Sequence, residues 1–213
     1  CKVERIDWSG REVYVGVDLA MTNDNCSVTM SAEEDGEILS HVMTFIPEGR
    51  IDEKSEFEKF DYRAAIAAGT CIACGDMTVD YGVIEDYVEG LEESRGVVIK
   101  SIGYDRYNAL SSAQKWDKDY TTVEIRQHSD TLHPPTKLLA EMVANQKWHY
   151  EDNRLLETNF ENAKCTYDTN MNRYVNKKKS KGKVDGVVSI INSVYLLQQD
   201  ILFDDSGFTV QVC

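Results

Sequence analysis

The chain has 213 residues, of which 42% are hydrophobic and only three are proline, so it is long enough for one large domain and is not a collagen-like, low-complexity or wholly disordered polymer. Its 23 Lys and Arg residues against 37 Asp and Glu residues give a net charge of −14. The molecule as a whole therefore repels a polyanion, and any contact with nucleic acid must be local.

Targeting and redox signals favour a soluble, reduced, intracellular protein. No apolar run reaches the roughly 20 residues that span a bilayer, so no membrane partner is expected, and the N-terminus lacks the apolar core of a signal peptide. The cysteines lie too far apart for a disulfide framework. Cys71 and Cys74 form a single CxxC, and no second pair follows in the sequence. Buried thiols are therefore favoured over zinc or redox chemistry. The chain does not begin with Met, which indicates a part of a longer protein.

The first half of the chain predicts a three-stranded antiparallel meander followed by helices. An apolar run at 14–19 contains Asp18, and segments 26–32 and 38–46 alternate on either side of a turn at 34–37. Segment 56–68 has helical spacing, with apolar residues at 57, 60, 64 and 67, and stops at Gly69. Segment 79–81 leads into a second helix, which has apolar residues at 84, 87, 88 and 91 on one face and ends at Gly96. Asp80 precedes this helix, where a capping role is favoured.

In the second half, strands and helices alternate as in parallel βαβ units. Strand 97–105 ends in Asp105 and is followed by a helix at 108–116 and a strand at 122–125. A helix at 137–146, a hairpin pairing 165–167 with 173–175, a helix at 184–197 and a tail from 203 complete the chain. The expected fold is α/β, a mixed sheet flanked by helices. We expect one domain over 1–213, with a core at about 12–200 and short terminal extensions.

Three aspartates are the candidate catalytic residues. Asp18 and Asp105 end predicted strands, where α/β sheets usually present catalytic groups, and Asp185 opens the last helix. Three gathered carboxylates repel one another unless a cation offsets their charge, so the set predicts hard divalent ions, Mg²⁺ or Mn²⁺. A pair of such ions activates a water and neutralises the leaving oxygen in phosphodiester hydrolysis. Taken singly, each aspartate also fits a turn, a cap or a helix N-terminus.

Positive charge is concentrated just before Asp185, in Lys177, Lys178, Lys179, Lys181 and Lys183. These lysines are candidates for DNA backbone contacts, and a solvated loop is the alternative. Arg106 and Asn108, which flank Asp105, are candidates to orient its carboxylate or to touch a phosphate. Asp24 lies in the turn after the first strand, where a second metal ion and a plain turn role are both open.

Three motifs occur together in an order that resembles one protein family. They are VGVDLA at 15–20, followed by Thr22 and Asp24, then IGYDRYNA at 102–109 and KKKSKGKVDGVV at 177–188. Asn162, the predicted hairpin and segment 78–81 fall in matching places. From about residue 12 to about residue 200, the chain resembles the C-terminal nuclease domain of the large terminase subunit of tailed bacteriophages, which has a ribonuclease H-like fold.

The resemblance implies roles for these residues. In that family, the residues matching Asp18, Asp105 and Asp185 bind catalytic metals, and the domain cuts concatenated double-stranded viral DNA during genome packaging. It further implies two Mg²⁺ or Mn²⁺ ions, an N-terminal ATPase motor in the full-length protein, portal and small terminase subunits as partners, and the host bacterial cytoplasm as location.

One family element is missing, because no GxxxxGK[ST] phosphate loop occurs in these residues. Two alternatives to the terminase interpretation stay open. One is another ribonuclease H-like nuclease, such as a junction resolvase or recombinase, and the other is a non-catalytic docking or regulatory domain of the same fold.

Overall fold

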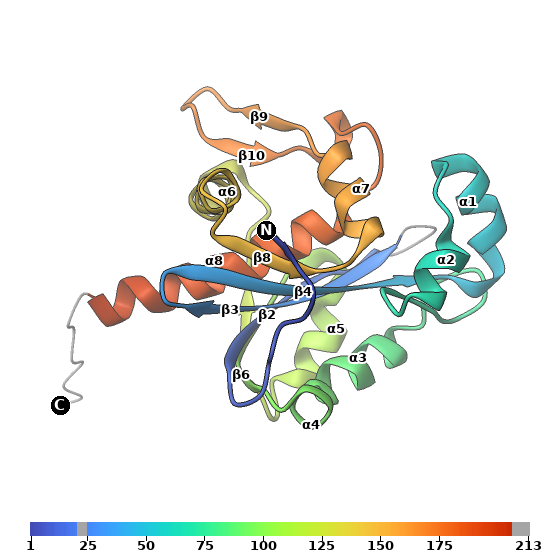
Figure 1. Cartoon of the computed structure of the whole chain (residues 1–213), viewed down its shortest axis with the longest axis horizontal. Helices are drawn as coiled ribbons and strands as arrows, with labels where there is room; N and C mark the ends of the chain where they lie inside the picture. The colour runs from blue at the N-terminus through green and yellow to red at the C-terminus, as the bar shows by residue number, and fades with distance from the viewer. Residues whose placement is uncertain (21–24, 206–213) are drawn as a thin grey trace.

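A computed structural model of the chain describes residues 1–20 and 25–205, and the side chains of 202–205 are outside this description. Within these residues, one sheet contains eight strands in the order β1-β8-β4-β3-β2-β6-β7, with β5 paired to β4 (Figure 1). None of the helices in the described part of the chain is both long and apolar enough to cross a bilayer.

The meander expected from the sequence forms the centre of the sheet. Strands β2 (Glu12–Asp18), β3 (Cys26–Glu34) and β4 (Glu37–Ile46) pair antiparallel in chain order. Strand β6 (Val98–Tyr104) then lies parallel to β2, and β7 (Thr122–Glu124) lies parallel to β6. This mixed arrangement confirms the predicted ribonuclease H-like sheet.

Three short strands on the other side of the meander were not predicted. They are β1 (Lys2–Val3), β5 (Cys71–Ala73) and β8 (Trp148–Glu151), and all of them pair parallel to their neighbours. Each has two to four residues, which is too short to display an alternating pattern.

Helices cover both faces of the sheet. On one face lie α3 (Tyr81–Glu89), α4 (Leu91–Arg95) and α5 (Arg106–Trp116). The long helix α8 (Asp185–Asp205) packs against β2 and β3 on the other face, with α6 (Ser129–Ala144) and α7 (Arg154–Asn162) beside it. The hairpin β9 (Cys165–Tyr167) and β10 (Arg173–Val175) lies outermost on that face and has the predicted residues.

Three helix predictions are corrected by the structure. The second helix, expected to end at Gly96, is two helices, α3 and α4, which are separated at Gly90. The single helix expected at 56–68 is two helices, α1 (Ile51–Glu58) and α2 (Tyr62–Ala67), because Lys59 adopts a left-handed conformation with φ of 55°. Helix α6 begins at Ser129 and contains Pro134 and Pro135, rather than beginning after them. Proline has no N–H to donate, so carbonyls in the first turn of α6 lose their helical hydrogen bond. This turn is exposed to water at residue 130.

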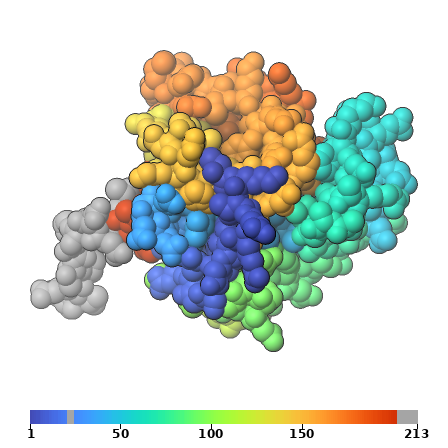
Figure 2. Space-filling model, viewed as in Figure 1, coloured from blue at the N-terminus to red at the C-terminus, as the bar shows by residue number. Residues whose placement is uncertain are grey.

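The pair α1–α2 stands at one side of the molecule. In Figure 2 it forms the cyan lobe beside the orange surface of α7 and the hairpin. A short 3-10 helix, η1 (Glu48–Arg50), leads into it from β4, and a second, η2 (Lys177–Lys179), lies between β10 and α8. The lobe and the lysine-rich segment both border the cavity described below.

Candidate metal centre

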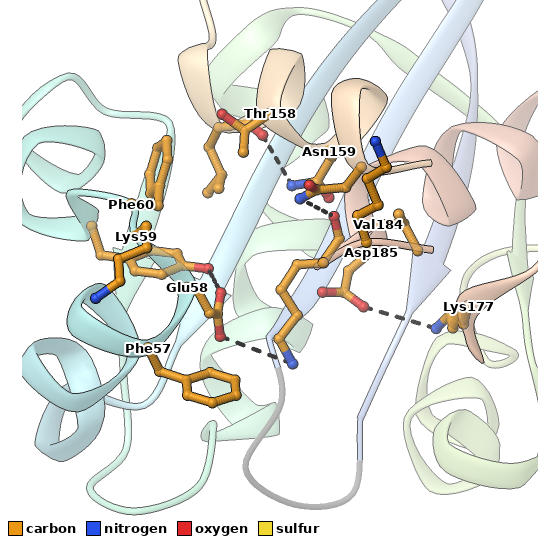
Figure 3. Close-up of a pocket in the computed structure, with 15 residues that line it drawn as sticks. Phe57, Glu58, Lys59, Phe60, Thr158, Asn159, Lys177, Val184 and Asp185 are labelled. Carbon is orange, nitrogen blue, oxygen red and sulfur yellow. Dashed lines mark hydrogen bonds and ion pairs between the residues drawn. The ribbon is translucent and has the colours of Figure 1, made fainter. Parts of the chain in front are cut away.

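Asp18 and Asp185 lie together although they are far apart in the chain. Asp18 is the last residue of β2 and Asp185 the first residue of α8, and each is only 5% exposed. The ammonium of Lys177 links them: its Nζ lies 2.8 and 2.6 Å from the two carboxylate oxygens of Asp18 and 3.9 Å from Oδ1 of Asp185. Figure 3 shows the side chains of Lys177 and Asp185 directed toward each other. The structure thus places two buried carboxylates around one cation.

Buried polar contacts hold α8 in the position that brings Asp185 to this point. The side-chain amide of Asn192 donates a hydrogen bond of 2.9 Å to the carbonyl of Val17, beside Asp18. At the start of the helix, the amide N–H of Gly186 donates to Oδ1 of Asn159 at 3.0 Å. These side chains are buried, so leaving either bond unmade would cost about 1–3 kcal/mol. The position of the pair is therefore built into the core.

Burial shapes the electrostatics of the two aspartates. Loss of hydration raises the pKa of Asp18, although the charge and hydrogen bonds of Lys177 act in the opposite direction. Burial, followed by repulsion from Asp18, raises the pKa of Asp185 to about 6. Oδ2 of Asp185 is buried without a hydrogen-bond partner among the described residues. An anionic pair with an unused oxygen is chemically suited to an additional or exchanged cation.

Asp105 lies near this pair but has a different local role in the structure. It is the N-cap of α5, and its Oδ1 accepts a hydrogen bond of 3.3 Å from the backbone N–H of Tyr107. Its charge nevertheless acts on both Asp18 and Lys177. Across residues 1–20 and 25–205, no three His, Cys, Asp or Glu side chains are grouped closely enough to hold a metal ion. The structure therefore brings two of the three predicted aspartates together and leaves the third at the edge of the site.

A cavity of about 550 Å³ opens beside Asp185 (Figure 3). One wall comes from the α1–α2 lobe and includes Phe57 and Glu58. The opposite wall comes from α7 and the lysine-rich segment. A second hollow includes Asp105, and Lys177 lines both. Asp185 and Asp105 consequently each line a hollow whose wall also contains the basic side chain of Lys177.

The other predicted DNA-binding residues take distinct positions. Lys178, Lys179 and Lys181 are exposed, whereas Lys183 is partly buried, with its Nζ 4.0 Å from Oε1 of Glu58. Arg106 is exposed at the start of α5. Asn108 donates a hydrogen bond of 2.8 Å to the carbonyl of Leu19, so it joins α5 to the end of β2. Asp24, the candidate for a second metal, lies outside the described residues.

Sequence reasoning missed the residues that surround Asp185 from α1, α2 and α7. Glu58 is 12% exposed, accepts a hydrogen bond from the hydroxyl of Tyr62, and its Oε1 lies 2.8 Å from Nζ of Lys54. Its negative charge adds to the rise in the pKa of Asp185. Neither Glu58 nor Asn159 belongs to a recognisable motif, and both approach the site only through tertiary packing. No signal in the sequence could have found them.

Two side features are resolved by the structure. Asp80 caps α3 through a hydrogen bond of 2.8 Å from the backbone N–H of Gly82, which confirms the capping role. Cys71 and Cys74 are free, buried thiols, 2% and 6% exposed. Burial raises the pKa of both thiols, which disfavours the reactive thiolate.

Comparison with known proteins places the chain in one family. The family model described as "Terminase large subunit, endonuclease domain" matches residues 1–200. The large terminase subunit of Enterobacteria phage HK97 is 23% identical over 189 residues, which cover 86% of this chain and 37% of that protein. The chain thus spans a little over a third of that relative.

Solved structures agree on the fold. The crystal structure of the HK97 large terminase matches with a TM-score of 0.82 at 21% identity, over 91% of this chain and 40% of that one. The nuclease domain of the large terminase of bacteriophage SPP1, solved with bound Mn, matches with a TM-score of 0.53 at 12% identity, over 94% and 96% of the two chains. This chain belongs to the family of terminase large subunit endonuclease domains.

Proposed function

We propose that this domain hydrolyses phosphodiester bonds of double-stranded DNA with the help of two divalent metal ions, Mg²⁺ or Mn²⁺, at Asp18, Asp105 and Asp185. The observation that carries this proposal is the pair of buried carboxylates, Asp18 and Asp185, arranged around a shared cation at the end of β2 and the start of α8. Burying two carboxylates side by side destabilises a fold, and groups buried at such a cost are concentrated at functional sites.

The donor set fits hard divalent ions. All the available ligand atoms are carboxylate oxygens, which Mg²⁺ and Mn²⁺ prefer, and Oδ2 of Asp185 has no other partner among the described residues. Asp18 and Asp185 would hold one ion, and Asp105 would join by turning its carboxylate away from the helix cap. When bound, the ions supply an activated water and neutralise charge on the leaving oxygen. The related SPP1 domain was solved with Mn bound.

Basic residues beside the cavity would position the DNA backbone. Lys178, Lys179 and Lys181 are exposed within a few residues of Asp185, and Arg106 follows Asp105 directly. Lysine and arginine contacts to phosphate give affinity without reading sequence. They would allow a chain of net charge −14 to hold DNA only at the site. Asn108 would act indirectly, by fixing the ends of β2 and α5 against each other.

In the full-length protein, this domain would act together with further parts. We propose an N-terminal ATPase motor in the same chain, portal and small terminase subunits as partners, and cutting of concatenated viral DNA in the cytoplasm of the infected bacterium. The length of the HK97 relative beyond the matched region is consistent with such a motor.

One observation favours a second candidate, a non-catalytic docking domain of the same fold. The described residues do not bring three metal-ligand side chains together. A domain of this fold without nuclease activity would also lack such a group. Such a domain would bind DNA or a partner and would not cut.

Cleavage of supercoiled plasmid in Mn²⁺ or Mg²⁺ separates the two candidates. The proposal expects nicked and linear products with wild-type protein and none with Asp18→Asn, Asp105→Asn or Asp185→Asn. Asp119→Asn removes the same charge from an exposed position after α5 and serves as the matched control. Absence of cleavage by wild-type protein in both metals would favour the docking domain. Full activity in one variant would remove that aspartate from the site.

A further inference from the structure

Lys177 differs from the other lysines of its segment in what its side chain contacts. Both oxygens of Asp18 lie within 2.8 Å of its ammonium, and Oδ1 of Asp185 lies 3.9 Å away. Lys178 and Lys179, the next two residues, are exposed like Lys177 but form no ion pair with a carboxylate of the described residues. A run of lysines that served only to bind phosphate would not require one member to cross to a strand end 159 residues earlier in the chain.

The backbone holds Lys177 in place independently of its side chain. The side-chain oxygen of Asn176 accepts a hydrogen bond of 3.2 Å from the N–H of Lys179, and the hydroxyl of Ser180 donates one of 2.8 Å to the carbonyl of Asn176. The Lys177 side chain remains 49% exposed, whereas those of Asp18 and Asp185 are 8% exposed. Its ammonium can therefore leave the carboxylates for solvent without any rearrangement of the loop.

The ammonium and a divalent ion would compete for the same atoms. An ion held by Asp18 would need carboxylate oxygens at roughly 2.0–2.1 Å for Mg²⁺, and the ammonium occupies both oxygens of Asp18. The two cations also repel each other at such separations. Simultaneous full occupation of Asp18 by both is therefore strongly disfavoured.

We propose that Lys177 is the resident cation of the metal-free site, and that it exchanges with the first divalent metal ion. This inference rests on the proposed function, since it assumes that Asp18 and Asp185 bind metal. In the metal-free protein, Lys177 stabilises two buried carboxylates and keeps them together. After exchange, its ammonium is released at the cavity beside Asp185, where the DNA backbone would lie. Lys177 is thus a positioning residue for the empty site and becomes a phosphate contact when the site is loaded.

Metal affinity gives the first test. Mn²⁺ titrated into the protein and followed by electron paramagnetic resonance and calorimetry should bind about tenfold more tightly to Lys177→Met than to wild type, which corresponds to about 1.4 kcal/mol. Lys178→Met is the matched control, because it removes the same charge from the adjacent residue, and its affinity should change less than about twofold. Lys177→Arg keeps the charge and should bind Mn²⁺ close to the wild-type level.

Thermal unfolding gives an independent readout. Without metal, Lys177→Met should melt at a lower temperature than wild type and Lys178→Met, because the two buried carboxylates lose their counter-charge. Saturating Mn²⁺ should raise the melting temperature of Lys177→Met more than that of wild type, since ligand binding to the folded state stabilises it.

The outcomes separate failure of the inference from failure of the proposed function. If neither wild type nor any variant binds Mn²⁺, the proposed metal centre is wrong, and the proposed exchange is wrong with it. If wild type binds Mn²⁺ but Lys177→Met binds it equally or more weakly, the metal centre stands and the exchange is overturned. An unchanged metal-free melting temperature in Lys177→Met would likewise overturn the role of resident cation.

Discussion

Helix α8 touches strand β2 at Gly16 through its backbone: a Cβ built on Gly16 would lie 2.2 Å from the carbonyl oxygen of Ser189. The contact lies two residues before Asp18 and one helical turn after Asp185. It sets the distance between the strand and the helix that carry the two aspartates. The geometry of the site therefore depends on a glycine that contributes no side chain to it.

Gly16→Ala should destabilise the protein strongly and weaken Mn²⁺ binding. The added methyl group would clash with backbone atoms of α8, which can move less than the end of a side chain. Overpacking a core typically costs about 1–3 kcal/mol, and we expect the upper end here. Gly103→Ala is the matched control, since Gly103 pairs with Gly16 in the neighbouring strand. Its added Cβ would meet mainly the terminal methyl of Ile125, at 2.5 Å. Urea unfolding and Mn²⁺ titration would test this, and equal effects of the two substitutions would contradict it.

Buried hydroxyl groups fill the rest of the contact between α8 and the sheet. The Ser189 hydroxyl lies 2.9 Å from that of Ser27 and 2.7 Å from that of Thr29, and all three residues are fully buried. Ser189→Ala should lower the free energy of unfolding by about 1–3 kcal/mol, because the buried Thr29 hydroxyl then loses its hydrogen bond to Ser189 and the Ser27 hydroxyl keeps only its longer bond of 3.4 Å to the carbonyl of Met43. Ser111→Ala, at an exposed position of α5, should change it by less than about 0.5 kcal/mol. Comparable values would argue against a structural role for the network.

Asp185 should make the metal-free protein less stable as pH rises. Its pKa is about 6 in the folded state, against 3.8 for an unperturbed aspartate. Between these values the folded state binds more protons than the unfolded state, so stability falls with rising pH. Asp185→Asn should remove this fall and, at pH 7 in chelator, be more stable than wild type while failing to bind Mn²⁺. Urea unfolding from pH 4.5 to 7.5 would test this, with Asp119→Asn as control. Parallel profiles for wild type and Asp185→Asn would refute it.

Exposed lysines before α8 should control the salt dependence of DNA binding. Lys178→Ala combined with Lys179→Ala should weaken binding to a labelled duplex in EDTA. It should also reduce the slope of log affinity against log salt by about 0.9 for each phosphate that the protein no longer neutralises. The control is Lys100→Ala combined with Lys118→Ala, which removes the same charge from β6 and from the segment after α5. Fluorescence anisotropy would measure both slopes, and a slope equal to wild type would make the segment a solvated loop.

The central strands and the ends that carry the aspartates could be predicted because their patterns are local. Val15 and Val17 alternate in β2 and are fully buried, and Asp18 follows where the strand ends. The hairpin residues were likewise fixed by the turn between them. Such signals depend only on residues that are close in the sequence, so they can be recognised without knowledge of the tertiary structure.

Other features depend on contacts between distant residues. The apolar spacing at 57, 60, 64 and 67 predicted one buried helical stripe, yet Phe57 is 85% exposed because the chain reverses at Lys59. Lysine is not a residue that favours φ above zero, so the sequence carried no sign of that break. In the same way, composition could assign Lys177 to a basic segment but could not pair it with Asp18.

Diffraction from crystals of the domain soaked in Mn²⁺ tests the metal centre most directly. We expect an anomalous peak bridging the carboxylates of Asp18 and Asp185, with the Lys177 ammonium moved off Asp18. A saturating soak that leaves no peak there, with Lys177 still bonded to both oxygens of Asp18, would contradict the assignment of this site to metal-dependent DNA cleavage.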